Sequence, residues 1–141
     1  MAHPLNQNRR TRGVILIEMA LILPLLLLIT FAVLEYGWMF TKMGQVTNAA
    51  RQGARIGVRP DATSADVNTA IDTFMSAAGF TTSQYTKSMS PSDPTTVPVT
   101  NTFTVTVTVT YSNITLTGFP LVPTPAQLQA VVKMAKEGPP S

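Results

Sequence analysis

The feature that most constrains this chain is an apolar run from Val14 to Leu34. Its 21 residues would span about 30 Å as an α-helix, which matches the hydrocarbon core of a bilayer. Three residues interrupt the run, namely Glu18, Pro24 and Thr30. A proline is tolerated in a bilayer helix, where it often causes a kink. The run therefore predicts a membrane-spanning helix.

The charges around this run predict its orientation. Arg9, Arg10 and Arg12 precede it, and no further arginine follows until Arg51. By the positive-inside rule, this asymmetry places the N-terminus in the cytoplasm. The three arginines account for the formal net charge of +3, because basic and acidic side chains balance from Val14 onward. A short basic N-terminal segment before an otherwise neutral chain indicates a membrane-orienting signal, so we expect no nucleic-acid partner.

Aromatic and charged side chains gather just after the run, at Glu35, Tyr36, Trp38, Phe40 and Lys42. This mixture is typical of the lipid headgroup boundary, so Glu35 is interpreted as an interfacial residue rather than a second subunit contact. A cleavable secretory signal is the alternative. Such a signal has an apolar region of about 7–15 residues followed by a small-residue cleavage site. Residues 31–35 match that site poorly, so a retained helix is favoured.

Helical character is expected to continue to residue 59. Two sets of side chains recur at every fourth position, small residues at Ala49, Gly53 and Gly57 and arginines at Arg51, Arg55 and Arg59. Because the two sets are offset by two residues, they lie on nearly opposite sides of a helix. The side of the helix that carries the small residues allows another backbone to approach closely, either in the protein's own head or in a second subunit. The Arg59-Pro60 step should end the helix, because a residue before proline avoids the helical conformation.

A second, amphipathic helix is predicted from Thr63 to Ala78. Thr63 and Asp66 form a capping-box pattern, and Gly79 is a natural residue for the end of the helix. The apolar stripe consists of Val67, Ala70, Ile71, Phe74 and Ala78. We also expect Phe74, Met75 and Phe80 to be core residues rather than an adhesive site.

The rest of the chain predicts a small sheet. The segment Thr102–Tyr111 alternates valine or aromatic residues with threonine, which is typical of a half-buried strand. An edge strand is expected around Ser83–Met89, and Leu128–Ala135 fits either a strand or a helix. The fold class is therefore α+β: a long N-terminal transmembrane helix that leads to a head with about three antiparallel strands and one packed helix.

Composition argues against an enzyme. The chain has no cysteine, and its one histidine is His3. Disulfides, thiolate metal sites and cysteine nucleophiles are excluded, and a zinc site or histidine acid–base chemistry has almost no ligands available. We expect no catalytic residue, no metal and no cofactor.

The residues around Gly13 carry a resemblance to a known family. The stretch from Gly13 to Glu18 resembles the processing site of type IV prepilins: a basic leader, a glycine, a cut, and an apolar helix with glutamate as its fifth residue. "VILIEMALILPLLLLITFAVLEYG", followed by "NAARQGARIGV", resembles the TadE-like family of minor pilins and pseudopilins. The resemblance covers residues 9–59. It departs at Met19, where an aromatic residue is common, and at Gln52, where an acid is usual.

The resemblance implies that a prepilin peptidase cuts between Gly13 and Val14; whether the new Val14 amine is methylated stays open. The implied segments are a leader (1–13), a transmembrane helix (14–41), its extramembrane continuation (42–59) and a small α+β head (60–141). The protein would sit in the bacterial inner membrane as a single-pass protein, with its head in the periplasm or outside the cell, and would enter an extracellular pilus on assembly. Its implied partners are other pilin or pseudopilin subunits, the peptidase, an inner-membrane assembly platform and the lipid bilayer.

Glu18 and Val14 would then form a subunit contact. A charge inside a bilayer costs roughly 2.5–3.5 kcal/mol at a central position unless it is paired. Within one helix Glu18 lies more than a turn from Val14, so the amine of a neighbouring subunit is the natural partner. A protonated Glu18 near the cytoplasmic boundary is the alternative, and Pro24 is either a subunit packing device or a tolerated kink. An uncleaved single-pass anchor that displays a ligand- or surface-binding domain competes with this function, and a secreted domain ranks third.

Overall fold

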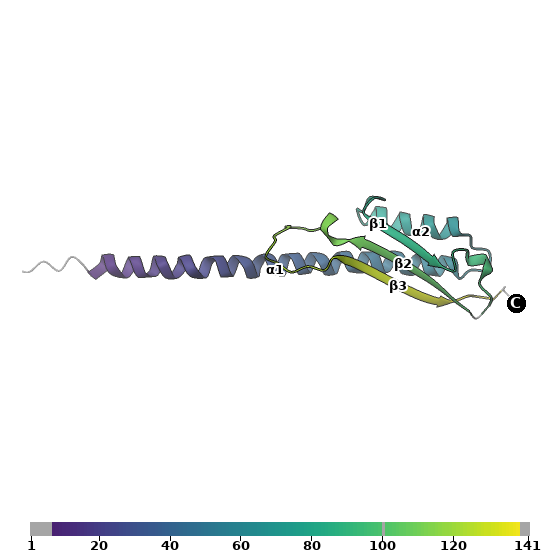
Figure 1. Ribbon diagram of the computed structural model, residues 1–141, viewed down its shortest axis with the longest axis horizontal. Coiled ribbons are helices and arrows are strands. Elements are labelled where there is room, and N and C mark those ends of the chain that lie inside the picture. The colour runs from purple at the N-terminus through teal and green to yellow at the C-terminus, as the bar shows by residue number, and fades with distance from the viewer. Residues whose placement is uncertain (1–6, 100, 139–141) are drawn as a thin grey trace, which may run out of the picture.

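A computed structural model describes residues 7–99 and 101–138, with side chains from Gly13 onward. The chain forms a long helix with a small head on its C-terminal half (Figure 1). The elements in chain order are α1 (Gln7–Gly57), α2 (Ser64–Ala77), β1 (Tyr85–Ser90), η1 (Pro94–Thr96), β2 (Thr102–Thr110), η2 (Tyr111–Asn113) and β3 (Gln127–Ala135). The α+β class and its lollipop form are confirmed.

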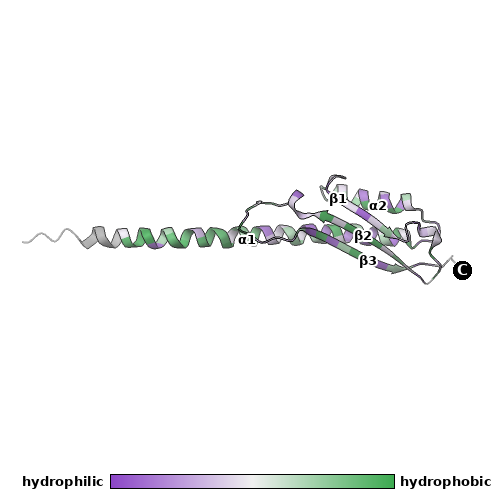
Figure 2. Ribbon diagram, in the orientation of Figure 1, coloured by the Kyte–Doolittle hydropathy of each residue, from purple (hydrophilic) through white to green (hydrophobic). Residues whose placement is uncertain are grey.

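The N-terminal half of α1 extends away from the head. Most side chains from Val14 to Leu34 are exposed, and α1 is the one helix in the described part of the chain that is long and apolar enough to cross a membrane (Figure 2). Pro24 lies inside α1, which stays helical on both sides of it. The helix already begins at Gln7, so the described part of the leader is helical, whereas its sequence shows no periodicity. Residues 1–6 lie outside the described part, as do the side chains of Arg9, Arg10 and Arg12.

The head contains a three-stranded sheet in the order β1-β2-β3, and both strand pairs are antiparallel. The predicted edge strand is present as β1. The ambiguous segment Leu128–Ala135 is a strand, because it lies within β3, which pairs with β2 along the whole length of both. Along β2 the alternation predicts burial correctly, since its four inward-facing residues, Phe103, Val105, Val107 and Val109, are fully buried.

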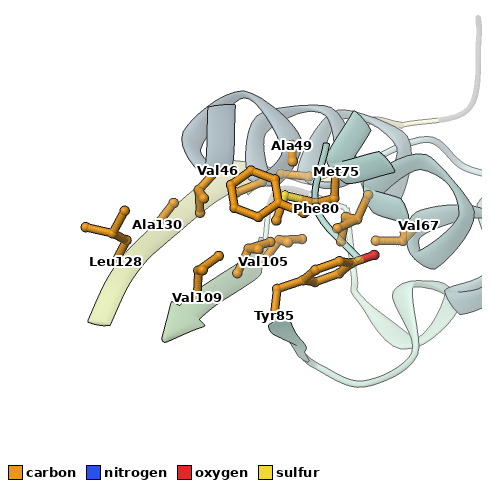
Figure 3. Packing of buried hydrophobic residues seen from close by; sticks show 14 of the residues in the cluster. Val46, Ala49, Val67, Met75, Phe80, Tyr85, Val105, Val109, Leu128 and Ala130 are labelled. Carbon is orange, nitrogen blue, oxygen red and sulfur yellow. The ribbon is translucent and has the colours of Figure 1, made fainter. Parts of the chain in front are cut away.

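The predicted packed helix, α2, covers the buried face of this sheet together with the C-terminal half of α1. Val46, Ala49, Ala50 and Ala54 of α1 belong to one core cluster with Val67, Ile71 and Met75 of α2 and the inward residues of β2. Figure 3 shows Val46 and Ala49 lying over Val105, Val109 and Ala130. The C-terminal half of α1 therefore completes the core that about 80 residues after Pro60 would form only marginally on their own.

Both predicted ends of α2 are present. At the N-terminus, the Asp66 amide donates to Thr63 Oγ1 (3.3 Å) and the Thr63 amide donates to Asp66 Oδ2 (2.9 Å), which completes the capping box. At the C-terminus, Gly79 has a φ of +80°, and the Phe80 amide donates to the Met75 carbonyl (2.9 Å). This geometry is a Schellman motif, which favours glycine because its left-handed residue has no Cβ.

The predicted apolar stripe of α2 is wrong at one position. Phe74 is 44% exposed, whereas Met75 is fully buried. The buried residues follow a spacing of four, Val67, Ile71 and Met75, and this spacing turns Phe74 toward the edge of the interface. Met75 and Phe80 are core residues, as predicted.

Candidate functional site

The residues singled out from the sequence lie in two separate parts of α1. Val14, Glu18 and Pro24 are exposed on the part of the helix that extends beyond the head. Among the residues whose side chains are described, no ion pair involves Glu18. Ala49, Gly53 and Gly57, by contrast, are buried inside the head. A single chain therefore leaves the first group available to other molecules and occupies the second group itself.

The small-residue side of α1 packs against the protein's own head. A Cβ added at Gly53 would lie 2.6 Å from Ile71 Cγ1, and one at Gly57 would lie 2.6 Å from Phe103 Cδ1. Both distances are far shorter than van der Waals contact, so a side chain at either position would force Ile71 or Phe103 to shift. Arg51 and Arg55 are exposed on the opposite side of the helix. Arg59 is also exposed but lies beyond the helix, which ends at Gly57 rather than at the predicted residue 59.

Glu35 lies at the junction between the bare part of α1 and the head, and it is only 1% exposed. Its carboxylate accepts four hydrogen bonds from the segment that joins β2 to β3. The donors are the Tyr111 hydroxyl (2.7 Å), the Leu116 amide (3.2 Å), the Thr117 amide (2.8 Å) and Thr117 Oγ1 (2.7 Å). The interpretation of Glu35 as a headgroup-facing residue is therefore wrong, because these donors replace water around the carboxylate.

This arrangement fixes the connecting segment to the helix. Hydrogen bonds to a charged group each contribute about 1.5–3 kcal/mol, and a buried carboxylate is costly unless it is hydrogen-bonded. Burial raises the pKa of the Tyr111 phenol, and the bond to Glu35 and the negative charge of Glu35 raise it further, so Tyr111 remains a donor. These hydrogen bonds therefore hold the connecting segment against α1 at the junction.

Neighbouring side chains of α1 also bind the β2–β3 connection, residues 111–126. The Tyr36 hydroxyl donates to the Pro123 carbonyl (2.9 Å), and Trp38 Nε1 donates to the Ile114 carbonyl (2.7 Å). The ring of Phe31 lies 5.3 Å from that of Phe119, centroid to centroid. The polar atoms of Tyr36 and Trp38 therefore contact the head itself, whereas Phe40 is 71% exposed.

Lys42 is a second charged group from the predicted boundary that is buried in the head. It is 8% exposed, and its Nζ donates to the Ala78 carbonyl (3.0 Å). The same nitrogen lies 4.8 Å from the centroid of the Trp38 ring and 4.5 Å from that of Phe80, which are cation–π distances. Burial lowers the pKa of Lys42.

The far end of α1 is held by Lys136. Its buried Nζ donates to the carbonyls of Gly57 (3.2 Å) and Arg59 (2.6 Å), and the Glu137 amide donates to the Val58 carbonyl (2.9 Å). A cation at a helix C-terminus satisfies free carbonyls and interacts favourably with the helix dipole. The segment after β3 therefore fixes the end of α1 to the sheet.

The described residues contain no cluster of histidine, aspartate and glutamate that would hold a metal ion. Sequence patterns do not identify Glu35, Lys42 and Lys136 as structural residues. Their one signal is that each is a charged residue close to an apolar or helical boundary, and this signal does not identify the partners.

Comparison with known proteins gives one family. A protein-family model described as "TadE-like protein" matches residues 13–55. No curated protein and no solved structure matches the chain. The match begins at the predicted cleavage site, includes Glu18 and Glu35, and ends within the part of α1 that packs in the head. The matched residues fall within residues 9–59, the part of the chain that resembles the same family in sequence.

Proposed function

We propose that this protein is a TadE-like minor pilin or pseudopilin, a non-enzymatic component of a tight-adherence pilus or a related secretion apparatus. A prepilin peptidase cuts between Gly13 and Val14, and the processed chain assembles with other pilin subunits. The observation that carries the proposal is the coincidence of the TadE-like match with a helix whose residues 14–34 are mostly exposed.

The exposed apolar helix supports membrane anchoring and assembly. Residues such as Leu16, Leu21 and Val33 are 66–74% exposed, which is unfavourable in water for so many large apolar side chains. A bilayer covers this surface before assembly, and the helices of other subunits cover it afterwards. The position of the protein in the inner membrane and its contact with an assembly platform belong to this proposal.

Glu18 gives the assembly its axial register. Cleavage creates a positively charged amine at Val14, and a buried carboxylate is tolerated when such a partner is available. The amine of one subunit pairs with Glu18 of the next, while lateral contacts of apolar side chains supply most of the binding energy. Pro24 shapes the packing of these helices, and Arg9, Arg10 and Arg12 hold the leader in the cytoplasm until cleavage.

The experiment compares Glu18→Ala with a matched exposed control, Glu137→Ala, in cells that hold the complete pilus system. Glu18→Ala should insert in the membrane and be cleaved normally. Its co-isolation with other pilus subunits should fall at least about tenfold, which corresponds to a loss of about 1.4 kcal/mol. Glu137→Ala should co-isolate normally. Normal co-isolation of Glu18→Ala would refute the amine-pairing role.

A further inference from the structure

The β2–β3 connection, residues 111–126, extends along α1 toward its apolar half (Figure 1). Three contacts fix its position on the helix. Ile114 binds Trp38, Thr117 binds Glu35, and Phe119 contacts Phe31. Successive residues of the connection therefore contact successively earlier positions on α1, and Phe119 reaches the last turn of the run that ends at Leu34.

The connection then returns, since Pro123 lies on Tyr36. Leu121 falls between Phe119 and Pro123 in the chain, so it belongs to the part of the connection that lies beside residues 31–36 of α1. Leu121 is 68% exposed, and Leu116, which is bound through its amide to Glu35, is 50% exposed. Val33 and Leu34 of the helix are also exposed, at 66% and 49%. Exposed apolar side chains therefore lie both on this part of α1 and on the connection beside it.

The composition of the connection suits a lipid surface. Residues 111–126 contain no aspartate, glutamate, lysine, arginine or histidine. Backbone amides are costly near lipid when they lack a partner, and here many of them are satisfied or absent. Pro120, Pro123 and Pro125 have no amide hydrogen, and the Leu116 and Thr117 amides donate to Glu35. Further amides donate within the connection or to its ends, at Tyr111, Ile114, Phe119 and Val122.

We infer that the β2–β3 connection docks the head on the bilayer, with Leu121 and Leu116 inserted into the interfacial zone of the leaflet on the head's side. This inference rests on the membrane anchoring in the proposed function. Phe31 lies about 5 Å inside the apolar run, measured along the helix from Leu34. That depth matches the depth at which apolar side chains of interfacial segments enter a membrane. Lipid contact on two sides, through α1 and the connection, restricts the tilt of the head.

The absence of cysteine in the sequence allows a direct test with single-cysteine variants of the full chain in phosphatidylcholine–phosphatidylglycerol vesicles. Leu121→Cys and Leu116→Cys are labelled with the environment-sensitive fluorophore NBD. Ser92→Cys, exposed in the turn after β1, is the control on the head. Leu25→Cys, exposed on the bare helix, reports whether α1 is in the bilayer. Lipids with a nitroxide on the acyl chain then quench any label that is in the membrane.

We expect nitroxide lipids to quench the labels at residues 121 and 116 at least threefold more than the label at residue 92. One outcome would overturn the docking and leave the anchor intact. In that outcome the label at residue 25 is quenched, but the labels at residues 121 and 116 are quenched no more than the control label at residue 92. Absence of quenching at residue 25 would overturn both. A label at residue 121 could instead be shielded from aqueous iodide without being quenched by nitroxide lipids. If tenfold dilution of the protein in lipid then removes this shielding, a second protein copy covers the surface and the inference is wrong.

Discussion

The hydroxyl of Tyr111 donates a 2.7 Å hydrogen bond to the carboxylate of Glu35, across 76 positions of the sequence. This bond joins the last turns of the exposed helix to the segment between β2 and β3. Lys136 makes the corresponding link at the other end of the head, where it donates to the carbonyl of Gly57, the last residue of α1, and to that of Arg59 just beyond it. The head is therefore fixed to α1 at both ends, and a force or a tilt imposed on the helix is transmitted to the head.

Glu35→Gln should destabilise the head by about 2–4 kcal/mol, because an amide group cannot accept from all four donors that surround the carboxylate. Tyr111→Phe removes one bond and should cost about 1–2 kcal/mol. Chemical denaturation of the detergent-solubilised protein measures both changes. Glu137→Gln, at an exposed position, is the control. Equal stability of Glu35→Gln and the control would contradict the role assigned to Glu35.

Gly57→Ala should destabilise the protein by about 1–3 kcal/mol, because the added methyl group would lie 2.9 Å from Cζ and 2.6 Å from Cδ1 of the buried Phe103 ring. Gly44→Ala is the matched control, since a Cβ at that position meets nothing within 4 Å. It should be neutral or stabilise the helix by up to about 1 kcal/mol. Thermal unfolding of the two variants measures the difference. If both behave alike, the small-residue side does not pack closely in the head.

The stability of the head should fall in acid through Asp72. Burial alone would raise the pKa of Asp72, but the hydrogen bonds from Lys87 (2.6 Å) and Tyr85 (2.5 Å) outweigh burial and lower it below its ordinary value of 3.8. The contribution of this carboxylate is therefore present above pH 3.8 and is lost as the pH falls through the lowered value. The effect should be modest, because the Asp72 side chain is 40% exposed.

The denaturation midpoint of the wild type minus that of Asp72→Asn should shrink between pH 7 and pH 3. At alkaline pH, Tyr85 gives the opposite pH dependence, because its contribution to stability is lost as the pH rises. Burial first, and then Asp72, raise the pKa of Tyr85 to about 12, so its contribution is present below pH 10 and is lost as the pH rises to about 12. A constant difference between wild type and Asp72→Asn across the acid range would refute the role of the Asp72–Lys87–Tyr85 cluster.

Local patterns predicted local structure well. The alternation from Phe103 to Val109 identified β2 and its buried side, and the Thr63–Asp66 pair identified the start of α2. The segment within β3 stayed ambiguous because its apolar residues fit two periods, and only pairing with β2 decides between them. The stripe of α2 was one residue out of phase at Phe74, because the packing of α2 on α1 decides which of two adjacent apolar residues is buried.

Sequence patterns could not predict the contacts of Glu35 at the junction between the exposed part of α1 and the head. Glu35 follows the apolar run directly, where headgroup contact is the usual expectation. Its partners, Tyr111 and Thr117, lie 76 and 82 positions away, and no periodicity links them to Glu35. Lys42 and Lys136 were missed for the same reason, since their acceptors are backbone carbonyls that carry no sequence signal.

The central claim is that the mature protein starts at Val14 and keeps its helix. N-terminal sequencing and intact-mass analysis of the protein from its native membranes test this claim directly, in cells with and without the prepilin peptidase. We expect Val14 as the first residue, with or without a methyl group, and an uncut chain when the peptidase is absent. A start at Met1 or Ala2 in cells with active peptidase would contradict it in favour of an uncleaved anchor, and a start beyond Glu35 would identify a secretory signal.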